Sequence, residues 1–304
     1  MSAVPAEPLQ PLPPLPPLLQ LEDLRVDVDG VPSCDGLTFT TTGDRVLVLG
    51  APRSLFEATC GLRPVMRGAL RVRGRAAKEA VREGLVAGAP LDPPLPPSWS
   101  AAQYVTWSAR LAGFAKADAR ALASRAIGLA QLGAFDGARL DRMPPHARRG
   151  VVLAAALATD AAVIVLEDPL AGLPEEIARS FARILARALA DRAWLVLSAR
   201  VPLTSPLAMN ADEALAITSS RLLAQGAPAE IAAADRRFIA RIHSARPLDD
   251  LGALLAARGA RLEVQGAQVV LDLGESVTTA ELLGMCAAEE AVVVEMTPVA
   301  RALG

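Results

Sequence analysis

The stretch VIVLEDPLAGLP, from Val163 to Pro174, decides the fold of this chain. Its first four residues are all apolar, which is typical of a buried parallel strand, and Pro169 lies just beyond it. Glu167 and Asp168 follow at the carboxyl end of this strand, where open α/β sheets place their ligands. Two such carboxylates could hold Mg²⁺ and orient a water for phosphoryl transfer. The alternative is that both acids are merely solvated at a strand end.

The residues before this strand extend the pattern. MPPHARRGVVLAAALATD, from Met143 to Asp160, leads directly into the strand, and from Ala147 it has the small and apolar spacing of a buried helix. The whole run resembles the ATP-binding subunits of ABC transporters, in which a signature loop, a helix, a strand ending in Asp-Glu-Pro and a Gly-Leu-Asp turn follow one another. The matching residues are Arg148, Arg149, Leu153, Ala154, Ala156, Leu157, Asp160, Leu166, Pro169, Gly172 and Leu173.

Several positions that contact nucleotide in that family carry other residue types here. Val28 stands where an aromatic ring stacks on adenine, and Arg200 stands where a histidine senses the γ-phosphate. The prolines of the signature loop lack the N–H groups that clasp this phosphate. Glu167 and Asp168 exchange the positions of the Walker B aspartate and the catalytic glutamate, and Ala87 or Ala89 replaces the glutamine that links Mg²⁺ to the membrane partner. The altered positions outside the strand ends are Val28, Pro144, Pro145, His146, Pro174 and Arg200.

The phosphate-binding loop is also altered. GDRVLVLGAPRSLFEATCGL, from Gly43 to Leu62, resembles the family's strand, loop and helix, but it has ten residues between Gly50 and Gly61 where the family pattern has fourteen. No lysine is present to reach the β- and γ-phosphate oxygens. Gly50, Arg53 and Ser54 could form a remnant phosphate site. The favoured interpretation is a capped helix start, with Ser54 as N-cap and Glu57 completing a capping box.

These combined losses argue against ordinary ATP hydrolysis, because phosphoryl transfer depends on positioning and electrostatic stabilisation. The resemblance therefore implies a degenerate, noncatalytic ATP-binding-type subunit on the cytoplasmic face of a membrane, bound to a transmembrane permease. It would pair with itself or with an active subunit. No cofactor is expected, although ATP and Mg²⁺ would bind, with Glu167 on the metal, if a phosphate site survives. The alternatives are a divergent active ATPase that uses Arg53, Ser54, Glu167 and Asp168, and a soluble scaffold or regulatory pseudo-ATPase.

Composition agrees with this interpretation. The chain has 304 residues with a net charge of −2, which predicts no nucleic-acid partner. Apolar residues make up 52% and aromatic residues only 3%, so we expect helices that pack closely through small side chains. The three cysteines are odd in number and fit reduced cytosolic thiols. The longest apolar run, 151–166, is interrupted by Asp160 and is too short to span a membrane. We expect no secretory signal peptide, because the proline-rich start lacks a basic n-region.

The expected fold class is α/β, with a P-loop-NTPase-like ABC nucleotide-binding domain over residues 21–234. It should contain a central, mostly parallel sheet, an antiparallel β portion and a helical subdomain at about 98–140. A small C-terminal α/β domain is expected over 248–304, and a proline-rich disordered arm over 1–20. In the family, the helical subdomain receives the permease. Trp99, Tyr104 and Trp107 at its start are candidate interface residues, unless they pack inward.

Overall fold

The computed structural model describes residues 15–199, 201, 203, 205–234, 237–244, 246–265, 268–273 and 277–298. Most of the predicted proline-rich arm and Arg200 lie outside these residues. The first strand already begins at Leu19, whose side chain is buried. No helix within the described part of the chain is both long and apolar enough to cross a bilayer.

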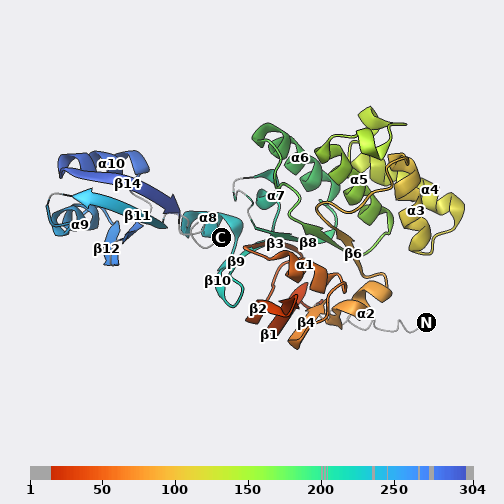
Figure 1. Ribbon diagram of the computed structural model, residues 1–304, viewed down its shortest axis with the longest axis horizontal. Helices are drawn as coiled ribbons and strands as arrows, with labels where there is room; N and C mark the ends of the chain where they lie inside the picture. The colour runs from red at the N-terminus through yellow and green to blue at the C-terminus, as the bar shows by residue number, and fades with distance from the viewer. Residues whose placement is uncertain are drawn as a thin grey trace, which may run out of the picture.

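A six-stranded sheet forms the centre of the molecule, in the order β10-β9-β3-β8-β7-β6 (Figure 1). The five strands from β9 to β6 are parallel, and β10 pairs antiparallel with β9. The inner strands are short apolar runs because both faces of the sheet are covered. This confirms the expected mostly parallel sheet. The strands are β3 (Arg45–Leu49), β6 (Val86–Ala89), β7 (Val163–Glu167), β8 (Ala193–Ser198), β9 (Glu213–Ile217) and β10 (Leu222–Gly226).

One face of the central sheet packs on the expected antiparallel portion. This second sheet has the order β2-β1-β4-β5. Helix α1 (Arg53–Thr59) joins both sheets in one core, in which Leu55 and Phe56 are buried. The short helix α2 (Ala77–Arg82) follows β5. The four strands are β1 (Leu19–Val28), β2 (Val31–Thr40), β4 (Arg67–Val72) and β5 (Arg75–Ala76).

Helices cover the other face of the central sheet. α5 (Pro145–Ala158) and α6 (Glu175–Ala188) share its core, and α3 (Ala101–Leu111) and α4 (Lys116–Leu129) pack on α5 as the helical subdomain. Their contacts are rich in buried alanine, which allows the close helix packing expected from the composition. The shorter helical segments are η1 (Gly133–Phe135), η2 (Leu140–Arg142), α7 (Pro206–Met209) and α8 (Pro228–Ala234).

Residues 237–298 form a further unit with its own hydrophobic core, called the C-terminal unit below. Its elements alternate as β-α-β-β-α-β, and its sheet has the antiparallel order β12-β13-β11-β14, which is the ferredoxin-like arrangement. Strand β11 precedes residue 248, where the sequence pattern placed the start of this region. The elements are β11 (Arg237–Ser244), α9 (Asp249–Ala256), β12 (Arg261–Gln265), β13 (Gln268–Asp272), α10 (Thr279–Ala288) and β14 (Ala291–Pro298).

Candidate functional site

Only three residues connect β3 to α1 at the place of the phosphate-binding loop. Gly50 has a left-handed φ of 77°, and a Cβ atom there would lie 2.2 Å from the carbonyl oxygen of Ile217. The Ala51 N–H donates to the Ser198 carbonyl at 3.3 Å, and Pro52 has no N–H. The connection is therefore pressed against the ends of β8 and β9. It lacks the open ring of amides that cradles phosphates.

Arg53 lies beside Glu167, as a phosphate-site cation would, but it contacts carboxylates of this chain. Its Nε is 3.1 Å from Glu57 Oε1 and 3.5 Å from Glu167 Oε1. The Leu91 N–H donates to Glu167 Oε2 at 3.0 Å. Glu167 itself is only 6% exposed. Both oxygens of this carboxylate are thus engaged by the protein.

The predicted capping box on α1 is wrong. The helix begins at Arg53 with Pro52 as N-cap and has no side-chain cap, because a proline side chain has no oxygen to accept from the first amides. The Ser54 hydroxyl instead lies 2.7 Å from the Ser33 hydroxyl. The Glu57 carboxylate accepts from Arg53 and Arg63. Burial acts to raise the pKa of Glu57, but hydrogen bonds from Arg63 and Arg53 outweigh it and lower this pKa.

Asp168 is held by β8. The Ser198 hydroxyl donates to Asp168 Oδ1, and the Asp168 N–H donates to the Leu197 carbonyl at 2.9 Å. Its backbone has a φ of 39°, in the left-handed region that is unfavourable for residues other than glycine. The structure therefore brings Glu167 and Asp168 together with Arg53, and it gives each carboxylate a partner within the chain.

Arg149 is a part of this region whose role the sequence pattern did not suggest. Its Nη1 donates to the Pro169 carbonyl at 3.2 Å, which ties α5 to the turn after β7. Its Nε is buried and has no hydrogen-bond partner among the residues that the structure describes. Burial lowers the pKa of this guanidinium, although the charges of Asp92 and Asp168 act to raise it. Arg149, Leu91 and Glu167 line a cavity of about 10 Å³. That volume suits a single water and is far too small for a nucleotide.

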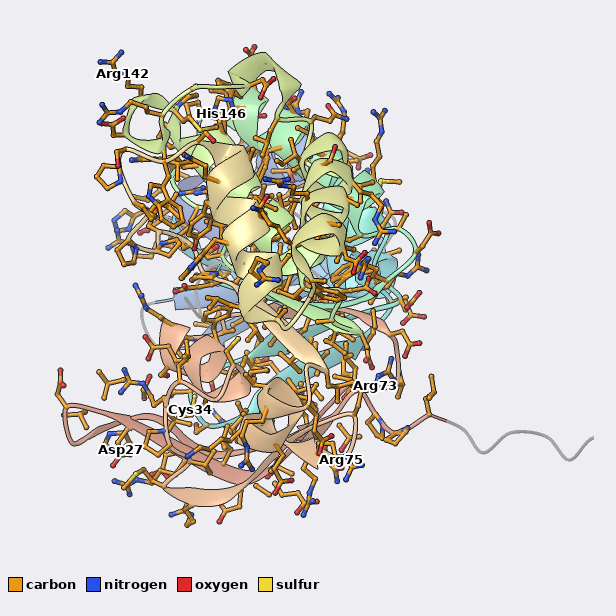
Figure 2. The ribbon with its side chains drawn as sticks, turned by 90° about the vertical axis from the view of Figure 1, so that its right-hand side faces the viewer. Asp27, Cys34, Arg73, Arg75, Arg142 and His146 are labelled. Carbon is orange, nitrogen blue, oxygen red and sulfur yellow. The ribbon has the colours of Figure 1, made fainter. Side chains whose placement is uncertain are left out.

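The altered signature residues form the start of a helix. Pro144 is the N-cap of α5, Pro145 is its first residue, and His146 follows. His146 is half-buried, and its ring lies 6.1 Å from that of Phe135 (Figure 2 labels His146). Pro174 is the N-cap of α6, and Val28 is the half-buried last residue of β1. Among the described residues, no group of three or more His, Cys, Asp or Glu could hold a metal ion.

The three candidate interface aromatics form one cluster. The rings of Trp99 and Trp107 are 5.9 Å apart and nearly perpendicular, and the rings of Tyr104 and Trp107 are 6.0 Å apart. Trp107 is 45% exposed, whereas Trp99 and Tyr104 pack partly against the core, and burial raises the pKa of Tyr104. Trp99 and Trp107 line a groove of about 940 Å³ between α3 and α4. The cluster therefore both packs inward and offers a surface.

The cysteines should be inert in the folded protein. Cys34, Cys60 and Cys286 are free and buried. Burial, and to a smaller extent the charge of Glu167, raises the pKa of Cys60 to about 12. Burial also raises the pKa of Cys34 to about 11, although a hydrogen bond with Ser54 acts to lower it. A pKa about three units above the usual 9 lowers the thiolate fraction at pH 8 by about a thousandfold. We expect iodoacetamide to label all three cysteines in guanidinium chloride and neither Cys34 nor Cys60 in buffer. Mass spectrometry would detect the contrary result, rapid labelling of either in the folded state.

No protein-family model matches the sequence, and no curated protein matches it significantly. Solved structures do match the fold. CbiO1 from Clostridium perfringens, part of the ABC transporter complex CbiONQ, is 18% identical with a TM-score of 0.61 over 72% of this chain and 91% of that one.

Two further structures agree with this match. An ATP-binding subunit of an ABC transporter is 16% identical, with a TM-score of 0.58 over 70% of this chain and 91% of its own. MJ1267, an ATP-binding cassette of an ABC transporter, is 14% identical, with a TM-score of 0.59 over 71% of this chain and 94% of its own. The chain therefore has the fold of the ATP-binding subunits of ABC transporters.

Proposed function

We propose that this protein is a degenerate, noncatalytic ATP-binding-type subunit of an ABC transporter, which docks on a membrane permease from the cytoplasmic side. The observation that carries the proposal is the state of Glu167: one of its carboxylate oxygens accepts from the Leu91 N–H, and the other lies 3.5 Å from the guanidinium of Arg53. A carboxylate engaged in this way is not free to hold a magnesium ion. No hydrolytic step is therefore assigned to it.

The surroundings of Arg53 support this proposal. A triphosphate needs a cation and amide donors, but the charge of Arg53 is already shared between Glu57 and Glu167. A triphosphate that used Arg53 would have to displace both of these carboxylates from its guanidinium. The three-residue connection from Gly50 to Pro52 adds no open amide ring. The residues present do not fit ATP and Mg²⁺.

The shape of the molecule supports docking. The sheets and helices of the fold are intact, although the residues at the family's nucleotide contacts are altered. CbiO1, which shares the fold, is part of a transporter complex. Trp107 is exposed beside the groove of the helical subdomain, and aromatic residues are favoured at the centres of interfaces. A permease segment that fills this groove would pair the subunit with its membrane partner. A homodimer or a heterodimer with an active subunit would complete such a transporter.

Nucleotide binding tests the proposal. We expect isothermal calorimetry with ATP and Mg²⁺ to give no binding heat at protein concentrations that detect a Kd of about 1 mM. In a reconstituted complex, wild-type protein and Asp168→Asn should support equal ATPase rates. Clear ATP binding that Glu167→Gln abolishes, with Glu175→Gln as the exposed control, would contradict the proposal and favour the divergent active ATPase.

A further inference from the structure

A second groove lies on the side of the antiparallel sheet, between the end of α1, β4 and the start of α2. It has a volume of about 490 Å³, and its walls are mostly apolar. Leu62, which lines the groove, is 73% exposed, and Met66 in the same loop is 59% exposed. Among the described residues, those that line the groove include no acid, and the charged ones are Arg63, Arg71 and Lys78.

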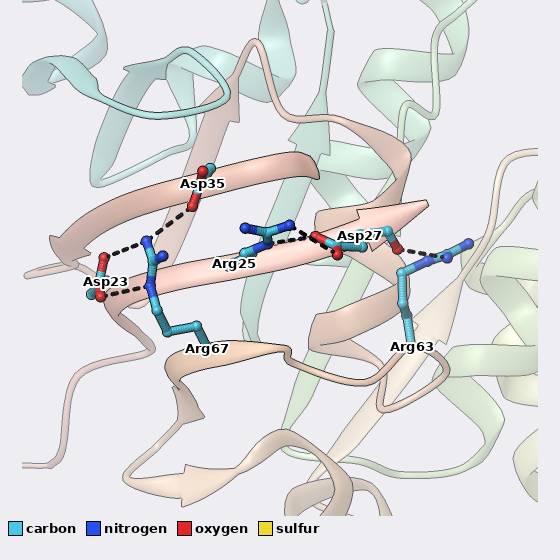
Figure 3. A network of polar contacts seen from close by, with 6 residues as sticks. All are labelled: Asp23, Arg25, Asp27, Asp35, Arg63 and Arg67. Carbon is cyan, nitrogen blue, oxygen red and sulfur yellow. Dashed lines mark hydrogen bonds and ion pairs between the residues drawn. The ribbon is translucent and has the colours of Figure 1, made fainter. Parts of the chain in front are cut away.

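Two of these cations differ from the other charged residues nearby. Most arginines of this segment have a carboxylate of their own: Arg67 bridges Asp23 and Asp35, and Figure 3 shows this bridge beside the contact from Arg63 to the Asp27 carbonyl. By contrast, Arg71 and Lys78 are exposed and have no acidic partner among the described residues. The groove therefore combines an apolar floor with uncompensated positive charge. The other paired arginines are Arg63 with Glu57, Arg73 with Asp44, and Arg75 with Glu83.

The complementary surface lies on this same chain. In the C-terminal unit acidic residues outnumber basic ones. Leu251 and Leu255 of α9 point into the core of this unit, so Asp250 and Leu254, one turn apart, share its outer face with Asp249. Neither aspartate has a basic partner among the described residues, and Leu254 is exposed. Helix α9 thus presents an acidic, leucine-bearing face.

We propose that α9 of one copy docks in the basic groove of a second copy. An amphipathic helix in an apolar groove is a common recognition mode, with Leu254 on the apolar floor and the two aspartates facing Arg71 and Lys78. In Figure 1 the C-terminal unit lies at the left end of the long axis, whereas β4 and α2 lie right of the centre. One copy therefore does not fill its own groove.

Two copies side by side in opposite directions would make this contact twice. Each α9 then meets the groove of the other copy, and the two-fold symmetry closes the dimer. Figure 2 labels Arg73 and Arg75, which lie at the turn from β4 to β5. This contact lies outside the region of Glu167, so it stands apart from the proposed function.

Sedimentation velocity on the full chain tests the contact. We expect a dimer that forms with increasing concentration and weakens as salt is raised from about 0.05 M to 0.5 M, because screening shortens the reach of charges. The double variant Arg71→Glu/Lys78→Glu should bind itself at least about a hundredfold more weakly, since it places like charges opposite each other. The milder Arg71→Gln/Lys78→Gln should weaken the dimer about tenfold. The control Lys116→Glu/Arg183→Glu carries the same change in charge on α4 and α6 and should dimerise as wild type does.

A charge exchange identifies the partner surface. Asp249→Lys/Asp250→Lys should be monomeric alone, because two positive surfaces then meet. Mixed with Arg71→Glu/Lys78→Glu, it should restore the dimer, since both contacts of the mixed pair are again complementary. A monomeric wild type, a dimer that resists the groove substitutions, or a mixture that stays monomeric would each overturn the proposal. Circular dichroism melting curves establish that every variant is folded.

Discussion

Gly50→Ala is expected to destabilise the protein by at least about 3 kcal/mol, or to prevent folding. The backbone there has a φ of 77°, which costs a residue with a Cβ about 1–2 kcal/mol. The new Cβ would also lie 2.2 Å from the Ile217 carbonyl oxygen. This oxygen belongs to the end of β9, so it can move only if the central sheet shifts. Urea unfolding followed by circular dichroism would measure the loss as a lower midpoint.

Gly84→Ala is the matched control. Its backbone φ of 71° is nearly the same, but nothing lies within 4 Å of its added Cβ. It should therefore cost only the strain of the left-handed backbone, about 1–2 kcal/mol. Equal losses of unfolding free energy in Gly50→Ala and Gly84→Ala would mean that the connection after β3 can shift to make room for the Cβ. That result would remove one argument against a phosphate site at Gly50.

The strands of the central sheet could be predicted because each is a short apolar run in the printed sequence. The runs at Val46, Val163 and Leu195 are buried on both faces of the sheet in the structure. Each is therefore a continuous apolar run, which is easy to identify as a strand. The order of elements around β7 was also readable, because helix, strand and turn follow one another without gaps. Local pattern and tertiary environment agree in this part of the chain.

The ion pair between Arg53 and Glu167 could not be predicted in the same way. Arg53 begins α1, which follows β3, and Glu167 ends β7, far away in the sequence. In the sheet, β8 lies between β3 and β7. Only the folded sheet decides that they meet. The cap on α1 failed for a local reason, since Pro52 starts the helix before Ser54. Strand β11 was missed because its pattern is mixed: Ala240 and Ile242 alternate with Arg241 and His243, but the apolar Ile239 breaks the alternation before them.

Glu213 is a buried carboxylate that the sequence pattern did not single out. It is only 3% exposed at the start of β9. It accepts hydrogen bonds from the Thr42 N–H and hydroxyl, each at 2.8 Å, from the Gly43 N–H at 3.3 Å and from Gln225 Nε2 at 2.7 Å. One side chain thus joins the β2–β3 turn to β9 and β10. Its position among apolar residues of a strand gives no sign of these partners.

Glu213→Ala should lower the free energy of unfolding by about 3 kcal/mol, because four donors lose one acceptor in a buried place. Glu213→Gln keeps one acceptor oxygen but turns an N–H₂ group toward donors. Its free energy of unfolding should therefore lie between those of the alanine variant and wild type. The adjacent Asp212→Ala is the control. Asp212 accepts from the side chain and the backbone N–H of Arg45 in a partly exposed place, so its loss should cost less, about 1–2 kcal/mol. Urea unfolding would separate the three. If Glu213→Ala proved as stable as Asp212→Ala, the prediction would be wrong. Water would then enter at β9 and replace the carboxylate as hydrogen-bond acceptor.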